Sequence, residues 1–194
     1  LVLIFPTSQR LVELFGLDKK TRELVEIAGS NINGEGYRAL RDIAKGEWVM
    51  SAYGVLIERQ TEKHSIQQSM EVHIEPFDYG GNLNHSCDGN LIVCPNGKGF
   101  TEYYAAKNIK KGEEITYHFA LTEFTWSDIA SENDIYCNCG TFKCEGVIKA
   151  FDMLTPTQQR EFVEKNIVSR YLSNWFKEQQ RQNPFYGKLK PKHI

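Results

Sequence analysis

The chain has 194 residues, of which 41% are hydrophobic and 25% charged, a composition that is typical of a folded globular domain and excludes an intrinsically disordered protein. The formal net charge of -2 disfavours direct binding to nucleic acid or to an anionic membrane surface. No apolar run approaches the ~18 residues that a membrane-spanning helix needs. We therefore expect one domain of ordinary size with short appendages.

The first predicted element is a short helix between Thr7 and Gly16, which closes on the glycine. From Leu24 to Phe119 the pattern changes to short β-prone runs, at residues 47–57, 70–74, 90–94, 100–106 and 114–119. Residues 95–99 read Pro-Asn-Gly-Lys-Gly, which is a turn signal. The runs on either side of this turn are predicted to form a hairpin.

A helix start is marked by Thr155, which lies three residues before Gln158 and directly before Pro156. Apolar side chains then recur every four residues, at Val163, Ile167, Tyr171 and Trp175. This spacing predicts one long amphipathic helix that ends at Asn183, directly before a proline. The basic residues from 187 to 194 are predicted to form a solvated tail.

Five cysteines are present, and three of them lie within the eight residues from Cys137 to Cys144 in the pattern Cys-x-Cys-x4-Cys. Such crowding favours metal-bound thiolates in a reducing compartment over disulfides, so an intracellular location, cytoplasm or nucleus, is expected. A tetrahedral zinc site needs a fourth ligand. Cys87, in a polar turn-rich segment, is the best candidate, although spacing alone allows it to be a structural cysteine. Cys94 ends an apolar run and is predicted to be a buried small hydrophobe.

Four motifs occur in the order that is typical of SET-domain lysine methyltransferases. Residues 84–90 resemble the Asn-His-Ser-Cys-x-Pro-Asn signature of that family, and residues 137–146 resemble its post-SET element, Cys-x-Cys-x4-Cys-x-Gly. Residues 34–37 and the run that follows them resemble the Gly-x-Gly opening. Residues 111–117 resemble the Gly-Glu-Glu-Leu-Thr motif and the aromatic residue after it.

The resemblance implies a mostly β SET-domain fold, with small curved sheets, a pseudoknot, a post-SET zinc knuckle, α-helical appendages and a C-terminal helix. It implies four segments: an N-terminal helical appendage (1–23), the SET domain (24–126), the zinc-binding post-SET segment (127–150), and the C-terminal amphipathic helix with the basic tail (151–194). The implied cofactors are S-adenosylmethionine and Zn2+. The implied reaction is N-methyl transfer to a lysine of a protein or peptide.

Roles for individual residues follow from the same resemblance. The backbone around Glu35, Gly36 and Tyr37 is expected to contact the methionine end of the cofactor, and Asn84 and His85 its amino group and adenine. The full set of residues expected at the cofactor is Gly34, Glu35, Gly36, Tyr37, Asn84, His85 and Tyr136. The expected zinc ligands are Cys87, Cys137, Cys139 and Cys144. The residues expected to border the amine are Tyr117, Phe119, Tyr53 and Tyr104. Strand alternation is expected to bury one residue of the pair Tyr103 and Tyr104 and to expose the other.

Several positions depart from the family pattern. In the final motif, this chain has Phe119 in place of the last tyrosine and His118 in place of the aspartate before it. Ala52 replaces the tyrosine of Tyr-x-Gly. Around Asn-His-Ser-Cys, Gly81-Asn82 replaces the preceding Arg-Phe, and Gly89 replaces the proline that follows. The changes at Phe119 and Ala52 remove two hydroxyls that are expected to orient the amine.

Three interpretations therefore stay open. The first is a protein-lysine methyltransferase in which Tyr117, Tyr53 or Tyr104 supplies the missing hydroxyls. The second is a SET-fold enzyme that methylates a small-molecule amine, and the glycine at 81 would suit an enlarged pocket. The third is a non-catalytic module that holds zinc and binds a partner. An unchanged Asn84-His85 pair argues against the third.

Overall fold

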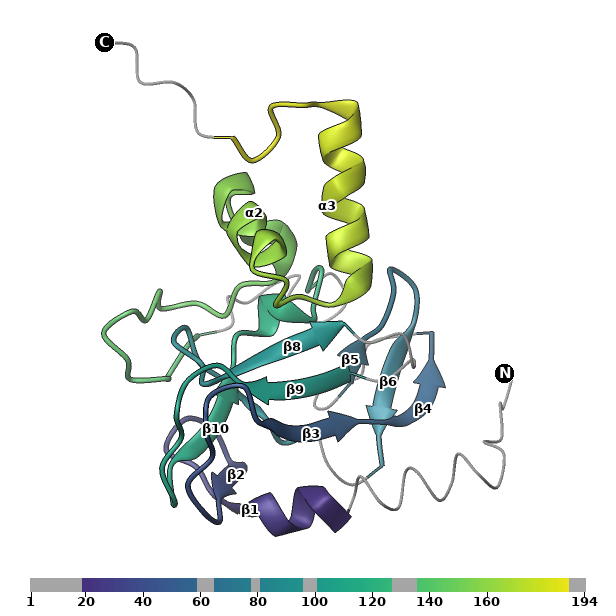
Figure 1. Ribbon diagram of the computed structural model, residues 1–194. Helices are drawn as coiled ribbons and strands as arrows, with labels where there is room; N and C mark the ends of the chain where they lie inside the picture. Colours follow the sequence, from purple (N-terminus) through teal and green to yellow (C-terminus); the bar gives the residue numbers. More distant parts are fainter. Residues whose placement is uncertain (1–18, 59–64, 78–80, 96–100, 127–135, 189–194) are drawn as a thin grey trace.

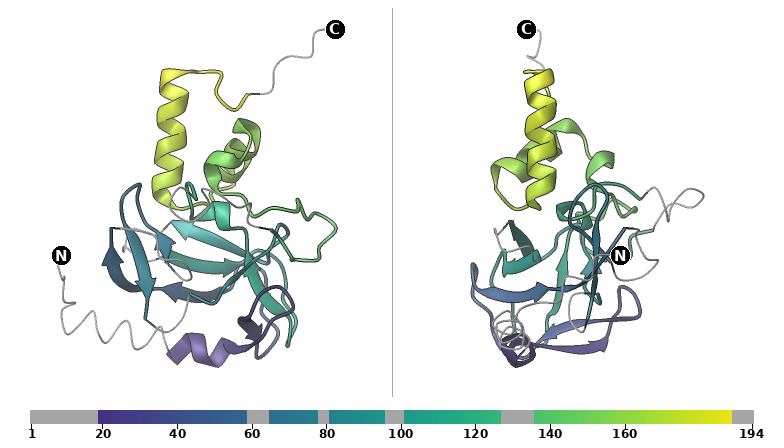
Figure 2. Two further views of the ribbon diagram at one scale, coloured as in Figure 1. Left: turned by 180° about the vertical axis from the view of Figure 1, so that it is seen from behind. Right: turned by 90° about the vertical axis from the view of Figure 1, so that its right-hand side faces the viewer.

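The structure, a computed structural model, describes residues 19–58, 65–77, 81–95, 101–126 and 136–188. The helix expected between Thr7 and Gly16, the turn residues 96–99 and the tail beyond residue 188 lie outside these ranges. In the described part of the chain, three small sheets form the body of the molecule. Two helices, α2 (Pro156–Glu164) and α3 (Arg170–Gln182), stand together on one side of it (Figures 1 and 2). No helix in these ranges has the length and apolarity that crossing a membrane requires.

The first sheet joins segments that are far apart in the sequence. Helical residues 19–24 lead into β1 (Val25–Gly29), which pairs with β2 (Glu35–Ala39). β2 also pairs with β10 (Glu114–Tyr117), and β10 pairs in parallel with the two-residue strand β7 (Asn84–His85). The segments that follow β7 and β10 therefore begin side by side.

The other two sheets are antiparallel. The hairpin predicted around residues 95–99 is confirmed on its strands, since β8 (Leu91–Pro95) pairs with β9 (Thr101–Ala105) along its full length. β3 (Trp48–Ala52) pairs with the other edge of β9. The run predicted at 47–57 is two strands, because the chain leaves β3 at Tyr53 and continues as β4 (Gly54–Ile57) in the third sheet with β6 (His73–Pro76) and β5 (Ile66–Gln67).

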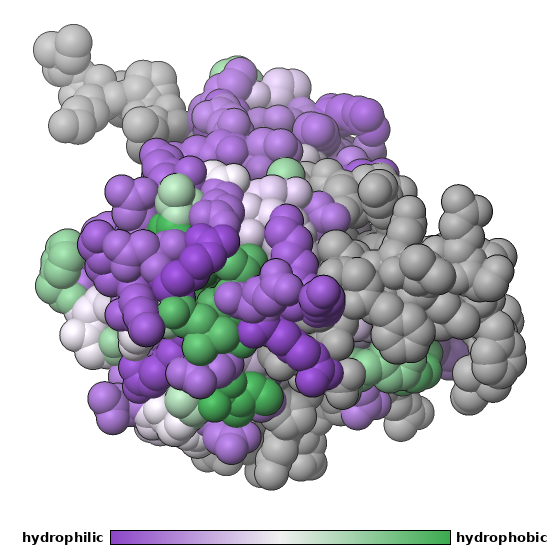
Figure 3. All heavy atoms as spheres, turned by 60° about the horizontal axis from the view of Figure 1, so that its bottom comes forward, coloured by the Kyte–Doolittle hydropathy of each residue, from purple (hydrophilic) through white to green (hydrophobic). Residues whose placement is uncertain are grey.

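The core lies between the sheets and beneath the two C-terminal helices. Along β9 the buried side chains alternate with partly exposed ones, so Tyr103 is buried while Tyr104 is partly exposed, as predicted. Fully buried side chains from the sheet that contains β2 and β10, from the sheet that contains β3 and β9, and from α3 share one cluster: Tyr37, Val49, Met50, Tyr103, Ile115, Leu172 and Phe176. The face turned forward in Figure 3 is mainly hydrophilic, with small separate groups of apolar side chains.

The prediction of one long C-terminal helix is wrong. The capping box of Thr155 and Gln158 with Pro156 does begin a helix, but α2 (Pro156–Glu164) ends after nine residues and α3 (Arg170–Gln182) follows separately. Asn166 adopts a left-handed conformation with φ of 54°, which breaks the helix. The linking segment then pairs with the body of the protein, since the Ser169 amide donates to the Leu121 carbonyl at 2.8 Å. The four-residue spacing missed the break because both helices turn apolar side chains toward the same core.

Candidate active site and cysteine cluster

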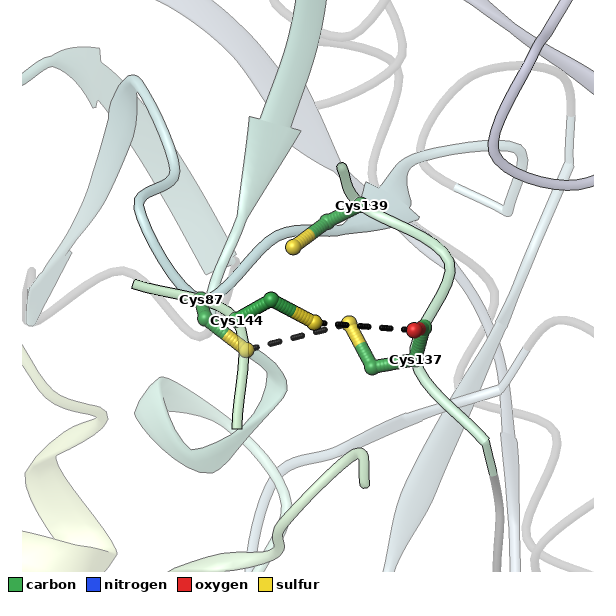
Figure 4. A group of neighbouring side chains, drawn as sticks. All are labelled: Cys87, Cys137, Cys139 and Cys144. Carbon is green, nitrogen blue, oxygen red and sulfur yellow. Dashed lines mark hydrogen bonds between the residues drawn. The ribbon is translucent and has the colours of Figure 1, made fainter. Parts of the chain in front are cut away.

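Four cysteines from two distant segments meet at one point (Figure 4). Cys87 follows β7, and Cys137, Cys139 and Cys144 lie on the loop of residues 136–147, here called the cysteine loop. The loop is closed by a bridge between Tyr136 and Val147 and by a hydrogen bond from the Cys137 amide to the Gly146 carbonyl. The four Sγ atoms lie within 4.8 Å of one another.

This geometry fits a tetrahedral metal ion. Zn–S bonds of about 2.3 Å place the sulfurs of a tetrahedral site about 3.8 Å apart, and the Sγ atoms of Cys87 and Cys137 are 3.7 Å apart. All four thiols are free of disulfide bonds. Cys94, on β8, is not part of the cluster among the described residues, as predicted, but it is partly exposed and not buried as expected, because it lies on the face of β8 opposite to the buried Leu91 and Val93.

Further contacts hold the cysteine loop against the body of the domain. The Glu145 amide donates to the Cys87 sulfur at 3.5 Å. Asp88, the residue after Cys87, pairs with Lys143 of the loop at 2.7 Å and with Lys107 of the body at 3.3 Å. These two ion pairs lower the pKa of the Asp88 carboxyl. The loop thus has polar anchors in addition to its sulfurs.

Asn84 connects the glycine-rich segment with the last sheet strand. Its Nδ2 donates to the carbonyls of Asn33 and Glu35, at 3.1 and 3.0 Å, and to Glu114 Oε1 at 3.0 Å. Gly36 lies directly beneath these groups, because a Cβ there would be 2.5 Å from Glu114 Oε1 and 2.9 Å from Asn84 Nδ2. The expected cofactor residues Gly34 to Gly36 and Asn84 therefore lie together, and among the described residues no donor reaches Asn84 Oδ1.

Two other residues expected at the cofactor differ in burial. The Tyr37 side chain is buried in the core, which leaves its backbone for a ligand, as the family resemblance implies. Tyr136 is 74% exposed at the start of the cysteine loop, and Phe142, further along the loop, is 91% exposed. The role of Tyr136 at the cofactor stays a prediction.

His85 bridges the cysteine cluster and the end of β10. Its Nδ1 accepts a hydrogen bond from the Phe119 amide at 3.2 Å, and its Nε2 lies 3.4 Å from the Cys87 sulfur. Burial, together with the neighbouring His118 ring, lowers the pKa of His85 to about 3, so the ring is neutral. Because both ring nitrogens already have partners, a contact between His85 and a cofactor would fall on its backbone.

Three aromatic residues, Tyr103, Tyr117 and Phe119, form what we call the aromatic group. The Tyr117 ring lies 5.1 Å from that of Tyr103 and 5.0 Å from that of Phe119. The Tyr117 hydroxyl lies 3.1 Å from the Thr122 hydroxyl, and burial raises its pKa. No described atom meets hydrogen-bond geometry with the buried Tyr103 hydroxyl, although burial and Tyr117 raise its pKa.

The replacements at Ala52 and Gly89 have clear structural settings. Ala52 is buried and opposite Thr101, so it lies on the same face of its sheet as Tyr103. At Gly89, an added Cβ would be 2.7 Å from the Tyr117 Cα. The proline that the family resemblance expects at this position would therefore collide with the backbone of β10.

Tyr53 and Tyr104 have other partners among the described residues. Tyr104 lies on the opposite face of β9 from Tyr103, and its hydroxyl donates to Glu102 at 3.0 Å. Tyr53 packs edge-on against Phe77 with ring centroids 6.2 Å apart. Of the four residues expected to border the amine, Tyr117 and Phe119 are in contact with each other.

Sequence reasoning missed Glu123. Its carboxyl is buried, with the residue 3% exposed, and accepts a hydrogen bond from the Gln67 amide at 3.0 Å. Burial raises the pKa of Glu123 to about 7. The local sequence Leu-Thr-Glu-Phe carries no sign of this burial, which depends on β5 and α3.

The three small sheets, the pairing of β7 with β10 and the nearby cysteine cluster agree with the SET-domain fold that the sequence predicts. Residues 34–120 match the family model described as "SET domain". Among curated proteins, the chain is similar to human Histone-lysine N-methyltransferase 2B, with 29% identity over 147 residues that cover 66% of this chain and 5% of that protein. It is also similar to mouse Histone-lysine N-methyltransferase, H3 lysine-36 specific, with 26% identity over 165 residues that cover 73% of this chain and 6% of that protein.

Among solved structures, the fold is similar to that of KRYPTONITE in complex with mCHG DNA and SAH, with a TM-score of 0.54, 22% identity and coverage of 64% of this chain and 29% of that one. The methyltransferase domain of human Histone-lysine N-methyltransferase SETMAR gives a TM-score of 0.51 and 21% identity, with coverage of 65% and 58%. These likenesses confirm the predicted fold. The chain spans only a small part of the curated relatives that it matches.

Proposed function

We propose that this chain is an S-adenosylmethionine-dependent N-methyltransferase that acts on a lysine side chain of a protein. The observation that carries the proposal is the Asn84 side chain, which ties the Gly34–Gly36 segment to Glu114 and begins the segment that leads to Cys87. The names of the curated relatives support a protein lysine as the acceptor.

The Gly36–Asn84 group fits the methionine end of the cofactor. When bound, S-adenosylmethionine supplies a methyl group on a positively charged sulfur. The Asn84 Oδ1 would accept from the amino group of the ligand, while its Nδ2 stays on the Asn33 and Glu35 carbonyls. A glycine at 36 allows this close approach of backbone and side chains.

Cys87, Cys137, Cys139 and Cys144 would hold one zinc ion with a structural role, because all four positions of a tetrahedral site are filled by protein thiolates. The ion would fix the cysteine loop to the segment after β7. Metal binding and the assembly of the cofactor site would then be linked.

Transfer needs a neutral amine, and neutralising a lysine with a pKa of ~10.4 costs about 4.6 kcal/mol at pH 7. An apolar wall lowers this cost by disfavouring the charged form. The aromatic group would supply the wall, and the Tyr117 hydroxyl would be its polar group. The second hydroxyl that the family resemblance expects is absent because residue 119 is phenylalanine.

We further propose that residues 24–126 form the catalytic domain, that 127–150 form the zinc-binding segment, and that 151–194 form the C-terminal appendage. An intracellular location, cytoplasm or nucleus, stays a prediction. The absence of nucleic-acid and membrane binding also stays a prediction, and KRYPTONITE itself was solved with DNA.

A small-molecule amine is the second candidate acceptor. It is favoured by the loss of hydroxyls at Ala52 and Phe119, since a lysine guided through a narrow channel would depend on them most. Non-catalytic binding is the third possibility, and the well-formed Asn84 contacts argue against it.

The test is to incubate the purified chain with methyl-labelled cofactor and a cell lysate and to separate proteins from small molecules. Label on protein lysines, found by mass spectrometry of peptides, is the expected result. Asn84→Ala is the control that should lose both labelling and cofactor binding. Label in the small-molecule fraction alone would favour the second acceptor, and no transfer to either fraction would contradict the proposal.

A further inference from the structure

Glu123 brings a carboxyl group into the interior next to the aromatic group. It lies two residues after η1 (Phe119–Leu121), and both its backbone groups are used, since its amide donates to the Phe119 carbonyl and its carbonyl accepts from the Phe151 amide. The Gln67 amide donates to Glu123 Oε1. The position of this carboxyl is therefore fixed from β5, η1 and the segment before α2.

Thr122 links Glu123 to Tyr117. The fully buried Thr122 hydroxyl lies 3.1 Å from the Tyr117 hydroxyl and 3.4 Å from the Phe119 carbonyl, and it interacts with the Glu123 carboxyl, whose pKa it lowers. The Thr122 carbonyl accepts from the Tyr171 hydroxyl of α3, which holds the same backbone from the other side. Tyr117, Thr122 and Glu123 thus form a row of two hydroxyls and one carboxyl.

The charge of the carboxyl decides the direction of the hydrogen bonds in this row. An ionised carboxylate only accepts, so it draws the Thr122 hydrogen away from the Phe119 carbonyl, and the Thr122 oxygen then accepts from the Tyr117 hydroxyl. The Tyr117 oxygen also interacts with the Tyr103 hydroxyl, and its second lone pair remains available to another donor. A protonated carboxyl can donate instead, which allows the Thr122 hydroxyl to turn toward Tyr117 and occupy that lone pair.

On the basis of the proposed function, we propose that Glu123 is a positioning residue that acts through Thr122 on the Tyr117 hydroxyl. With Glu123 ionised, the Tyr117 O–H points to Thr122, and the Tyr117 oxygen accepts from an N–H of the acceptor amine and thereby aims the nitrogen lone pair at the methyl group. No covalent bond changes in this step. The row compensates for the hydroxyl that Phe119 lacks.

Of the groups in the row, Glu123 is the one expected to change charge near neutral pH. The titratable groups that interact with it are Tyr103, Tyr117 and Tyr171, and burial raises the pKa of each of these hydroxyls. Burial also raises the pKa of Glu123 to about 7. The direction of the hydrogen bonds should therefore switch within the range in which the protein can be assayed.

The first test needs no activity. Tyrosine labelled with carbon-13 at Cζ is followed by NMR against pH, with the Tyr117 signal assigned by its loss in Tyr117→Phe. We expect a step in the Tyr117 shift with a midpoint at about 7, which Glu123→Gln and Thr122→Val abolish. Tyr171→Phe is the control for the general surroundings, since it removes a buried hydroxyl that donates to the Thr122 carbonyl and lies outside the row of Tyr117, Thr122 and Glu123, and it should keep the step. A flat Tyr117 signal in the folded wild type, or a step that survives in Glu123→Gln, would overturn the inference.

The second test is kcat/KM for a lysine peptide against pH. Glu123→Gln should lose the inflection at neutral pH and fall about 10-fold to 100-fold at pH 8, the effect of one hydrogen bond to a charged group. Thr122→Ser should restore the profile that Thr122→Val loses, with cofactor affinity unchanged in all variants. An unaltered rate and profile in Glu123→Gln would overturn the positioning role. If the wild type transfers to no acceptor, the proposed function fails, while the NMR step still decides whether Glu123 controls Tyr117.

Discussion

The cysteine loop and the aromatic group lie on either side of His85 and differ in how far they match the family pattern. Around the cysteine loop, every expected sulfur is present, and all four meet within 4.8 Å. At Phe119 of the aromatic group and at nearby Ala52, two expected hydroxyls are missing. The buried Glu123 carboxyl is separated from the Tyr117 hydroxyl by the side chain of Thr122. Metal geometry allows few substitutes for four thiolates, whereas an amine can be oriented by several arrangements of hydroxyls and carboxyls. The difference suggests that the acceptor side of this site is where the chain has diverged.

The largest expected effect comes from breaking the cysteine cluster. Cys139→Ser should lower zinc from one per chain toward zero, because a structural site of this kind contributes about 10 to 16 kcal/mol of binding free energy. Cofactor affinity should fall while the β body stays folded. Elemental analysis, calorimetry and circular dichroism measure the three quantities. Cys94→Ser is the matched control and should change none of them, and full zinc content in Cys139→Ser would rule out the assigned ligand set.

The role of the aromatic group is tested by restoring the expected hydroxyl at residue 119. Phe119→Tyr should raise transfer to a lysine peptide if the position is vacant, by up to the 10² to 10³ that a group aligned in the transition state is typically worth. Tyr117→Phe should abolish transfer or change the number of methyl groups added. Mass spectrometry of the peptide follows both. A lower rate in Phe119→Tyr, together with an unchanged product pattern in Tyr117→Phe, would favour the small-molecule acceptor.

The segment between the two regions is tested at Gly89. Gly89→Pro introduces the residue that the family resemblance expects, yet it places a Cβ 2.7 Å from the Tyr117 Cα and removes the hydrogen bond from the Gly89 amide to the Ser86 carbonyl. We expect a loss of about 3 kcal/mol in the free energy of unfolding, from overpacking and the lost bond. Urea denaturation measures it. Gly29→Ala, with open space around its Cβ, is the control and should stay within about 1 kcal/mol of wild type.

The smallest expected effect is a pH dependence of stability. Burial raises the pKa of Glu123 from 4.5 to about 7, so the folded state holds the proton more tightly than the unfolded state. This contribution is fully present below pH 4.5 and is lost as the pH rises through 7, at a cost of at most about 3 kcal/mol. Denaturation of wild type and Glu123→Gln at pH 5 and pH 8 compares the two. Between pH 5 and pH 8, the free energy of unfolding of the wild type should fall relative to that of Glu123→Gln. If the difference between the two proteins is the same at both pH values, the pKa of Glu123 is not raised.

The sequence predicts best where chemistry restricts the residue type. The structure confirms that the four cysteines cluster, that β8 and β9 form a hairpin and that a capping box at Thr155 begins a helix. Each of these predictions depends on residues that are close in the sequence or on a ligand set with few alternatives. The break at Asn166 was missed, since the apolar spacing continues across it.

Other features depend on contacts between distant segments. The two residues of β7 are too few to show a period, and their pairing with β10 is visible only in the fold. The strands β1 and β2 contain glycine and charged residues and gave no clear strand pattern. The sequence around Glu123 carries no sign of burial, which arises from Gln67 and from the helices that follow much later in the chain.

The contact between Tyr171 and the Thr122 carbonyl has a consequence for the boundaries of the catalytic unit. Tyr171 belongs to α3, which lies beyond the family match at residues 34–120 and beyond the cysteine loop. A fragment that stopped at residue 150 would keep every predicted zinc ligand and cofactor residue. It would lose the packing of α3 against Thr122 and Glu123, and these two residues would become exposed to water. A fragment meant to keep Thr122 and Glu123 buried would therefore have to extend through the end of α3 at Gln182, although this helix lies outside the family match.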